Sequence, residues 1–164
     1  MTVSYDEEAR IAYELLKKGG KRVTTAESCT GGLLGASIVM NPGASDVFDE
    51  GYLTYANEAK MKLLGVKEET LKSVGAVSEQ CACEMAAGAL KASRRSDFAL
   101  SVTGIAGPTG GTADKPVGTV WIGIADKASV RARRFLFSGN RDEVRCSSVK
   151  AALTMLIEHL NAHE

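Results

Sequence analysis

Apolar residues recur along the chain with two different spacings, which separate helical from extended segments. Recurrence every three or four residues predicts helices, and short apolar or alternating runs predict strands. The predicted helices are Tyr5–Lys18, Thr30–Met40, Asn57–Leu64, Ser78–Ala92 and Arg141–Leu160, and Ser78, followed by an acidic residue, is expected to cap the fourth. The predicted strands are Arg22–Thr25, Gly51–Tyr55, Phe98–Val102, Gly118–Ala125 and Val130–Phe137.

The order of these segments predicts the fold class. Helices alternate with the early strands, whereas the last two strands are separated only by residues 126–129 and predict a hairpin. Alternation favours parallel strands and a hairpin requires antiparallel ones. We therefore expect an α/β fold, a three-layer helix–sheet–helix sandwich with a mixed β-sheet, formed by residues 1–164 as a single domain.

Composition narrows the classes of partner. The 164 residues carry 20 basic and 20 acidic side chains, and aromatic residues make up 5%. This balance argues against nucleic-acid binding, which favours a basic excess and stacking platforms. No apolar run has the length of a membrane span, and the first residues are acidic, so we expect a cytoplasmic protein with reduced thiols. Zero net charge and a mixed sheet are compatible with a homodimer.

The segment Thr25–Gly32 (TAESCTGG) lies where a short strand meets a helix. A hydroxyl on such a turn is exposed, and N–H groups at the start of the helix are free to bind an anion. Ser28 is then a candidate nucleophile, and backbone N–H groups near Cys29, Thr30 and Gly31 are candidates for holding an oxyanion. The alternative is that Ser28 or Thr30 only caps the helix.

The general base for this serine must be a residue other than histidine. The chain has only His159 and His163, both near its C-terminal end, and no His-rich metal site. Tyr55 ends a predicted strand and Lys60 lies in the first turn of the next helix, where the helix dipole lowers the proton affinity of a lysine. The alternative is that Lys60 is a solvated lysine.

Two further segments have features of a ligand site. The glycine-rich stretch Gly104–Thr112 follows a predicted strand and suits a loop lying over a ligand, or an ordinary surface connection. Asn140 is placed to cap the final helix, which puts Arg141 in its first turn. An arginine there is unfavourable unless an anion such as phosphate shares the site, or unless Asp142 and Glu143 neutralise it.

Taken together, these segments resemble the CinA C-terminal domain family. The resemblance rests on TAESCTGG at 25–32, YANEAK at 55–60, GAVS at 75–78, SVTGIAGP at 101–108 and KPVGTV at 115–120, and it extends from about Tyr5 to Leu160. It implies a nicotinamide-nucleotide amidohydrolase that converts nicotinamide mononucleotide to nicotinic acid mononucleotide and ammonia in pyridine nucleotide salvage. Many relatives carry an extra N-terminal domain, and this chain starts directly with the amidase-like domain.

The resemblance also implies residue roles. It makes Ser28 the nucleophile, Lys60 the base and Tyr55 an assisting residue that relays or orients. It places Thr103 and Gly104 at the second strand end of the site and Arg141 at the phosphate. We expect no metal or organic cofactor. Glu27, Asn57 and Glu58 are expected either to place Lys60 or to act as surface and capping groups. Cys29 is the rival candidate nucleophile, but its side chain should point away from the site if Ser28 points in, so we expect it in the packing.

Two other functions compete with this one. A non-catalytic nucleotide-sensing or partner-binding module, linked to competence or DNA damage, would keep the glycine loop and Arg141 but would not need a base of lowered pKa. Pyrophosphatase activity on dinucleotides would need a carboxylate–metal cluster, and no acidic spacing in the sequence suggests one.

Overall fold

A computed structural model of the chain describes residues 3–163. Its centre is a five-stranded sheet of β1 (Val23–Glu27), β2 (Gly51–Leu53), β3 (Phe98–Gly104), β4 (Thr119–Ala125) and β5 (Val130–Leu136). The strand order is β2-β1-β3-β4-β5. β1 runs parallel to β2 and β3, whereas β3–β4 and β4–β5 are antiparallel, so the sheet is mixed as predicted.

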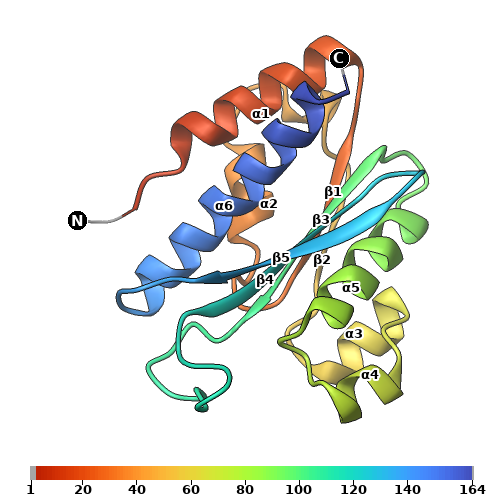
Figure 1. Cartoon of the computed structure of the whole chain (residues 1–164). Coiled ribbons are helices and arrows are strands. Elements are labelled where there is room, and N and C mark those ends of the chain that lie inside the picture. Colours follow the sequence, from red (N-terminus) through yellow and green to blue (C-terminus); the bar gives the residue numbers. More distant parts are fainter. Residues whose placement is uncertain (1–2, 164) are drawn as a thin grey trace.

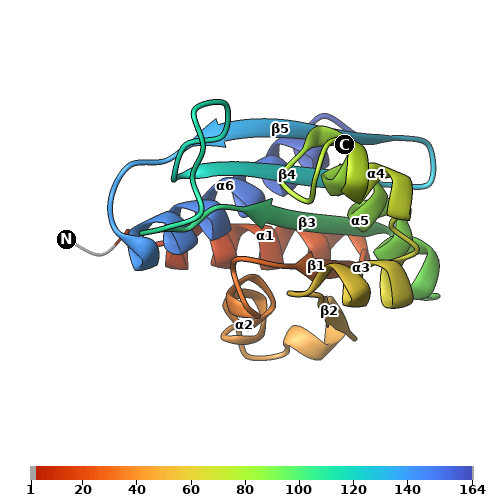
Figure 2. The same cartoon turned by 90° about the horizontal axis from the view of Figure 1, so that it is seen from below.

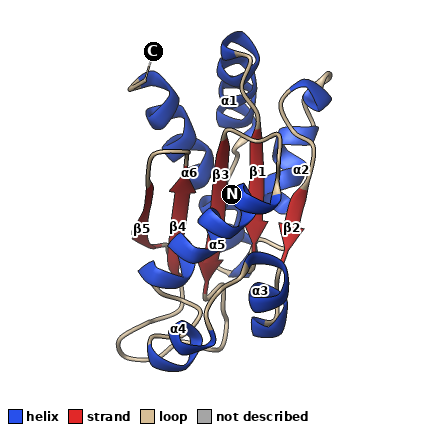
Figure 3. Ribbon diagram, turned by 90° about the vertical axis from the view of Figure 1, so that its right-hand side faces the viewer, coloured by secondary structure: helices blue, strands red, loops and turns tan. Residues whose placement is uncertain are grey.

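Helices cover both faces of the sheet (Figures 1 and 3). On one face lie α1 (Asp6–Gly19), α2 (Leu33–Val39) and α6 (Arg141–Asn161), and on the other lie α3 (Asn57–Leu64), α4 (Glu68–Ser73) and α5 (Glu79–Ala92). A short 3-10 turn, η1 (Ala44–Asp46), follows α2. The three-layer α/β sandwich predicted from the order of segments is confirmed.

Apolar residues form a core on each side of the sheet. The larger core joins α1, α2 and α6 to the sheet through residues such as Leu16, Leu100 and Leu153, each fully buried. The smaller core lies under α5 and includes Met85 and Ala99. These two apolar layers hold the carboxyl ends of β1 and β3 in place, side by side at one edge of the sheet.

The structure corrects several predicted boundaries, and one correction concerns the turn after β1. The helix expected from Thr30 begins at Leu33, because Gly31 and Gly32 take positive φ angles of 59° and 96°. Such angles are easily adopted only by glycine, and they end the strand before the helix can start. β1 itself reaches Glu27 rather than Thr25, and β2 ends at Leu53 rather than Tyr55.

Other predictions of local structure are confirmed. Ser78 caps α5 by accepting from the Cys81 N–H, and Asn140 caps α6 in a reciprocal capping box with Glu143. The short helix α4 was not predicted. The connection between β3 and β4, residues 105–118, extends beyond the end of the sheet (Figure 2).

None of the helices in the described part of the chain combines the length and the apolar character needed to cross a bilayer.

Candidate active site

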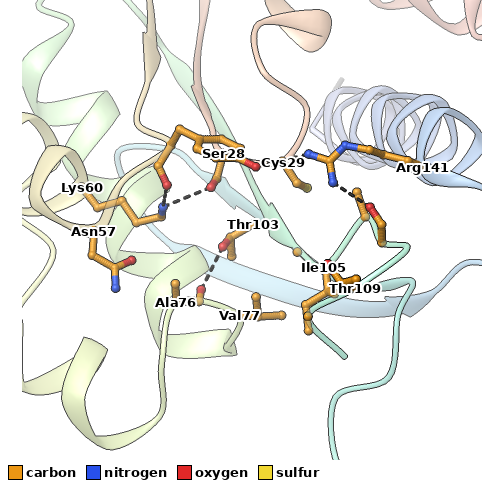
Figure 4. Close-up of a pocket in the computed structure, with 15 residues that line it drawn as sticks. Ser28, Cys29, Asn57, Lys60, Ala76, Val77, Thr103, Ile105, Thr109 and Arg141 are labelled. Atoms are coloured by element: carbon orange, nitrogen blue, oxygen red, sulfur yellow. Dashed lines mark hydrogen bonds between the residues drawn. The ribbon is translucent and has the colours of Figure 1, made fainter. Parts of the chain in front are cut away.

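A cavity of about 340 Å³ opens at the carboxyl ends of β1 and β3 (Figure 4). Ligands of α/β proteins commonly bind at this edge, where strand connections diverge. The cavity brings together seven residues proposed from the sequence: Ser28, Cys29, Tyr55, Lys60, Thr103, Gly104 and Arg141. Its other lining residues are Asn57, Ala76, Val77, Ile105, Ala106, Gly107, Thr109 and Gly110. Thr30 and Gly31, also proposed, lie in the turn behind Cys29 and are not among the lining residues.

Ser28 and Lys60 meet at the floor of this cavity. Ser28 follows the last residue of β1, and its N–H still donates to the Val102 carbonyl of β3, at 2.9 Å. The Nζ atom of Lys60 lies 3.1 Å from Ser28 Oγ, 2.8 Å from the Thr54 carbonyl oxygen and 3.0 Å from that of Tyr55. The side chain that the sequence left open as a solvated lysine is therefore buried, with a relative exposure of 1%.

Burial shifts the protonation equilibrium of Lys60 toward the neutral amine. Burial lowers the pKa of Lys60 below its ordinary value, because an ammonium loses its hydration inside the protein. Within residues 3–163 no carboxylate forms an ion pair with it. The nearby thiols of Cys81 and Cys29 raise the pKa of Lys60, but their effect is smaller than that of burial. A lysine in this setting has the character of a general base.

Glu27 closes the start of α2. Its carboxylate is buried and accepts from the N–H groups of Leu34 and Gly35, at 2.8 and 2.9 Å. The expectation that the first N–H groups of this helix face a ligand is therefore wrong for these two groups. Capping by Ser28 or Thr30 is also wrong, since neither side chain accepts a bond at the helix start and Glu27 provides the cap instead. Of the two roles considered for Glu27, the structure shows the capping one.

The turn between β1 and α2 retains unpaired backbone donors. The N–H of Gly31 donates to the Ser28 carbonyl at 3.0 Å, and the N–H of Leu33 donates to that of Thr30. In the described part of the chain, the N–H groups of Cys29 and Thr30 donate to no carbonyl oxygen. These two groups directly follow the candidate nucleophile, which is where an acyl-transfer site needs its oxyanion donors.

Gly104 offers a further donor at the end of β3. The neighbouring Ile105 N–H donates toward β4, to the Thr119 carbonyl at 2.9 Å. Successive N–H groups of a strand point in opposite directions, so the Gly104 N–H faces the side where β1 has already ended. A side chain here is excluded, because a Cβ atom on Gly104 would lie 2.6 Å from a methyl group of Val120. Thr103 differs from Gly104, since its hydroxyl donates to the Ala76 carbonyl at 2.9 Å (Figure 4).

The two parts of Tyr55 contribute at different places. Its carbonyl accepts from Lys60, whereas its phenol oxygen accepts from Arg141 at 3.2 Å and the residue is 63% exposed. The phenol has no hydrogen bond to Ser28 or Lys60 in the described structure, so the expected relay through it is not the arrangement found. Tyr55 touches Lys60 through its backbone.

Arg141 stands at the opposite wall of the cavity, at the start of α6. One terminal nitrogen donates to the Gly107 carbonyl at 2.7 Å and the other to the Tyr55 phenol. The carboxylates expected to neutralise it are engaged elsewhere, Asp142 with Arg145 and Glu143 in the helix cap. Among residues 3–163 no carboxylate pairs with Arg141, which leaves an uncompensated cation beside a helix N-terminus.

Arg145 contacts the turn after Ser28, a role that was not predicted from the sequence. One turn along α6 from Arg141, it donates to the carbonyl oxygens of Cys29 and Thr30, at 3.1 and 2.9 Å. The spacing of four residues between the two arginines places them on one face of the helix, and this was the available signal.

Cys29, the second candidate nucleophile, is 6% exposed and belongs to the larger core cluster. Burial is the main cause that raises the pKa of its thiol to about 11. A thiol with that pKa carries little thiolate at neutral pH and is a weak nucleophile.

The histidines lie away from the cavity. His159, near the C-terminal end of α6, is hydrogen bonded to Asp126 at 2.8 Å and to Arg131 at 3.1 Å, and His163 is beside it. The ligand atoms of Asp126, His159 and His163 gather within 4.8 Å of one another. The positive guanidinium of Arg131 beside His159 would repel a metal cation bound there. None of these residues lines the cavity that contains Ser28.

The chain is similar to known proteins over nearly all of its length. The family model described as the CinA C-terminal domain matches residues 6–160. The nicotinamide-nucleotide amidohydrolase PncC of Escherichia coli (strain K12) is 51% identical over 144 residues, which cover 87% of each chain. A CinA-like protein of Endomicrobium trichonymphae is 53% identical over 154 residues, 94% of this chain and 36% of the relative. The chain spans about a third of the length of several such relatives.

Solved structures share the fold. The competence/damage inducible protein CihA from Agrobacterium tumefaciens superposes with a TM-score of 0.92 at 44% identity, covering 98% of both chains. The competence damage-inducible protein A from Klebsiella pneumoniae superposes with a TM-score of 0.94 at 37% identity, covering 98% of this chain and 99% of the other.

Proposed function

Because the chain belongs to the CinA C-terminal domain family, we propose that it hydrolyses the carboxamide of nicotinamide mononucleotide to nicotinic acid mononucleotide and ammonia. The observation that carries this proposal is the buried contact between Lys60 and Ser28. In this role the protein would act in pyridine nucleotide salvage. A cytoplasmic location and a homodimer stay predictions.

The hydrogen bonds of Lys60 support its role as the base. A neutral amine has two N–H groups and one lone pair. The carbonyls of Thr54 and Tyr55 can only accept, so they take both N–H groups and leave the lone pair for Ser28. The serine hydroxyl then donates to Lys60, which is the direction that proton abstraction requires.

The reaction follows from this arrangement. Ser28 Oγ attacks the carboxamide carbon while its proton passes to Lys60, and the carbonyl oxygen becomes an oxyanion. The N–H groups of Cys29 and Gly104, two residues that line the cavity, are the candidate donors for this oxyanion, and the Thr30 N–H lies in the turn behind them. Lys60 returns its proton to the leaving nitrogen, ammonia departs, and an acyl ester remains on Ser28. Water, deprotonated by Lys60, then attacks the ester, the bond from the acyl carbon to Ser28 Oγ breaks, and Lys60 returns the proton to Ser28 Oγ as the carboxylic acid leaves.

The phosphate of the nucleotide is assigned to Arg141. This guanidinium has five N–H groups, of which the protein engages two in the bonds to Gly107 and Tyr55. It lines the same cavity as Ser28 and has no carboxylate partner in the described structure. A phosphate there would neutralise the positive charge of the Arg141 guanidinium and would bind beside the N-terminus of α6.

The test is ammonia release from nicotinamide mononucleotide in the presence of a chelator. We expect release by the parent protein and losses of about a thousandfold or more in Ser28→Ala and Lys60→Met. Ser45→Ala and Lys62→Met, at exposed positions, are matched controls that should keep the parent rate. A parent that binds the nucleotide without releasing ammonia would contradict the proposal and favour the nucleotide-sensing module.

A further inference from the structure

Arg145 holds the turn that follows Ser28 from the side of α6. Its Nε donates to the Cys29 carbonyl and one terminal nitrogen to the Thr30 carbonyl, across 116 and 115 residues of sequence. Arg145 does not line the cavity, so it is not placed to touch a substrate there. Its contacts are with the backbone directly behind the candidate oxyanion donors.

These two bonds determine where the N–H groups of the turn point. In a trans peptide the N–H lies antiparallel to the carbonyl of the preceding residue. A Cys29 carbonyl held by Arg145 therefore turns the Thr30 N–H away from the guanidinium. The same rule applied to the Thr30 carbonyl directs the Gly31 N–H away from Arg145, and it is found on the Ser28 carbonyl at 3.0 Å.

The turn is held from two directions. On the side of α2, the Glu27 carboxylate binds the Leu34 and Gly35 N–H groups. On the side of α6, Arg145 packs against Gly31, where an added Cβ atom would lie 3.4 Å from the guanidinium. The ion pair of Arg145 with Asp142 is long, at 3.6 Å, and the Asp142 side chain is 82% exposed. An exposed pair of this kind contributes little, so the carbonyl bonds are the main interactions of Arg145.

We propose that Arg145 is a positioning residue that orients the Cys29 N–H group toward the oxyanion formed at Ser28. Arg145 holds the Thr30 carbonyl, which directs the Gly31 N–H onto the Ser28 carbonyl, and the Cys29 N–H points opposite to that carbonyl. The inference rests on the acyl-transfer reaction proposed above. Its chemical basis is that oxyanion donors are effective only when their direction is set before the reaction. The planar guanidinium suits this task, because two donors in fixed geometry can hold two successive carbonyls.

The first test compares steady-state constants for nicotinamide mononucleotide in Arg145→Met and Arg145→Lys. We expect kcat to fall about tenfold to a hundredfold in both, with KM changed less than about threefold. Arg145→Lys keeps the positive charge but loses the planar guanidinium with its two donors. A fall in kcat in this variant therefore shows that orientation matters, and not charge alone. The pH dependence of kcat should stay unmoved, since Lys60 remains the base. Arg133→Met removes an exposed arginine paired with Glu158 and serves as the control.

A second readout is independent of the amide substrate. A fluorophosphonate reacts with an activated serine by forming a bond from Ser28 Oγ to phosphorus and expelling fluoride, with negative charge developing on the phosphoryl oxygen. We expect the rate of labelling in Arg145→Met and Arg145→Lys to fall by a factor similar to that of kcat. Should the parent label at Ser28 but fail to deaminate the nucleotide, the proposed function fails while the role of Arg145 is still tested.

Either variant at the parent kcat and labelling rate would overturn the inference. So would a fall in kcat that Arg145→Lys restores in full, because charge alone would then suffice. If Arg145→Met does not fold, Arg145→Lys decides between these outcomes.

Discussion

Lys60 Nζ lies 3.1 Å from Ser28 Oγ, although 32 residues separate the two in sequence. Ser28 directly follows β1 and Lys60 lies on α3, so the candidate nucleophile and the candidate base meet in a cavity that no described histidine lines. The pair is buried, and its remaining partners are backbone carbonyls. Each prediction below follows from this arrangement or from the residues around it.

The first prediction concerns pH. In the proposed mechanism neutral Lys60 is the active form, and burial lowers its pKa from the ordinary lysine value near 10.4. We expect kcat to be lost as pH falls through that lowered pKa, about tenfold per pH unit, and to level off above it. The measurement is kcat at saturating nucleotide, because the second ionisation of the phosphate near pH 6 affects binding. A kcat that rises toward acid would contradict Lys60 as the base.

The second prediction concerns Cys29. Its thiol is buried and has a pKa raised to about 11, so it is protonated at neutral pH. We expect Cys29→Ala to keep kcat within about threefold of the parent and iodoacetamide at pH 7.5 to leave activity intact. Ser28→Ala, measured in parallel, should lose activity. Loss of activity in Cys29→Ala with the fold preserved would make the thiol the nucleophile instead.

The third prediction concerns Arg141 and the phosphate. Removing the guanidinium in Arg141→Met should raise KM for nicotinamide mononucleotide about tenfold to a hundredfold, since a hydrogen bond between charged groups is lost. Nicotinamide riboside lacks the phosphate, so the same substitution should change its KM little. Arg133→Met is the control for loss of an arginine. An equal effect on both substrates would place the phosphate elsewhere.

The fourth prediction concerns Glu27 and stability. Glu27→Ala leaves the Leu34 and Gly35 N–H groups without their acceptor at the start of α2. We expect the free energy of unfolding to fall by about 2 kcal/mol, measured by urea denaturation. Glu14→Ala removes only an exposed ion pair with Arg10 and should cost less than about 0.5 kcal/mol. Equal losses in the two variants would mean that the Glu27 cap contributes nothing.

Much of the local structure could be predicted because it depends on neighbours in sequence. The 3.6-residue and two-residue periods placed most helices and strands, and the caps at Ser78 and Asn140 were recognisable from single residues. The short helix α4 was missed, since a segment of six residues has too few positions to show a period. The late start of α2 depends on the conformations of Gly31 and Gly32.

The candidate site divides in the same way. The turn at Ser28, the glycine-rich loop and Arg141 could be proposed from residue types, and the cavity brings them together. Three contacts could not be proposed in this way, because each depends on where distant elements pack. They are the buried cap by Glu27, the hydrogen bond between Arg141 and the Tyr55 phenol, and the bonds from Arg145 to the turn after Ser28.

The sequence by itself therefore determined the elements, the fold class and which side chains could take part in chemistry. Only the tertiary structure decided their states and directions. Burial, which lowers the pKa of Lys60, arises when α3 packs beside α5, and the orientation of the Cys29 and Thr30 carbonyls arises when α6 packs across the sheet. Local patterns record interactions within a few residues, whereas desolvation and donor geometry are properties of the packed chain.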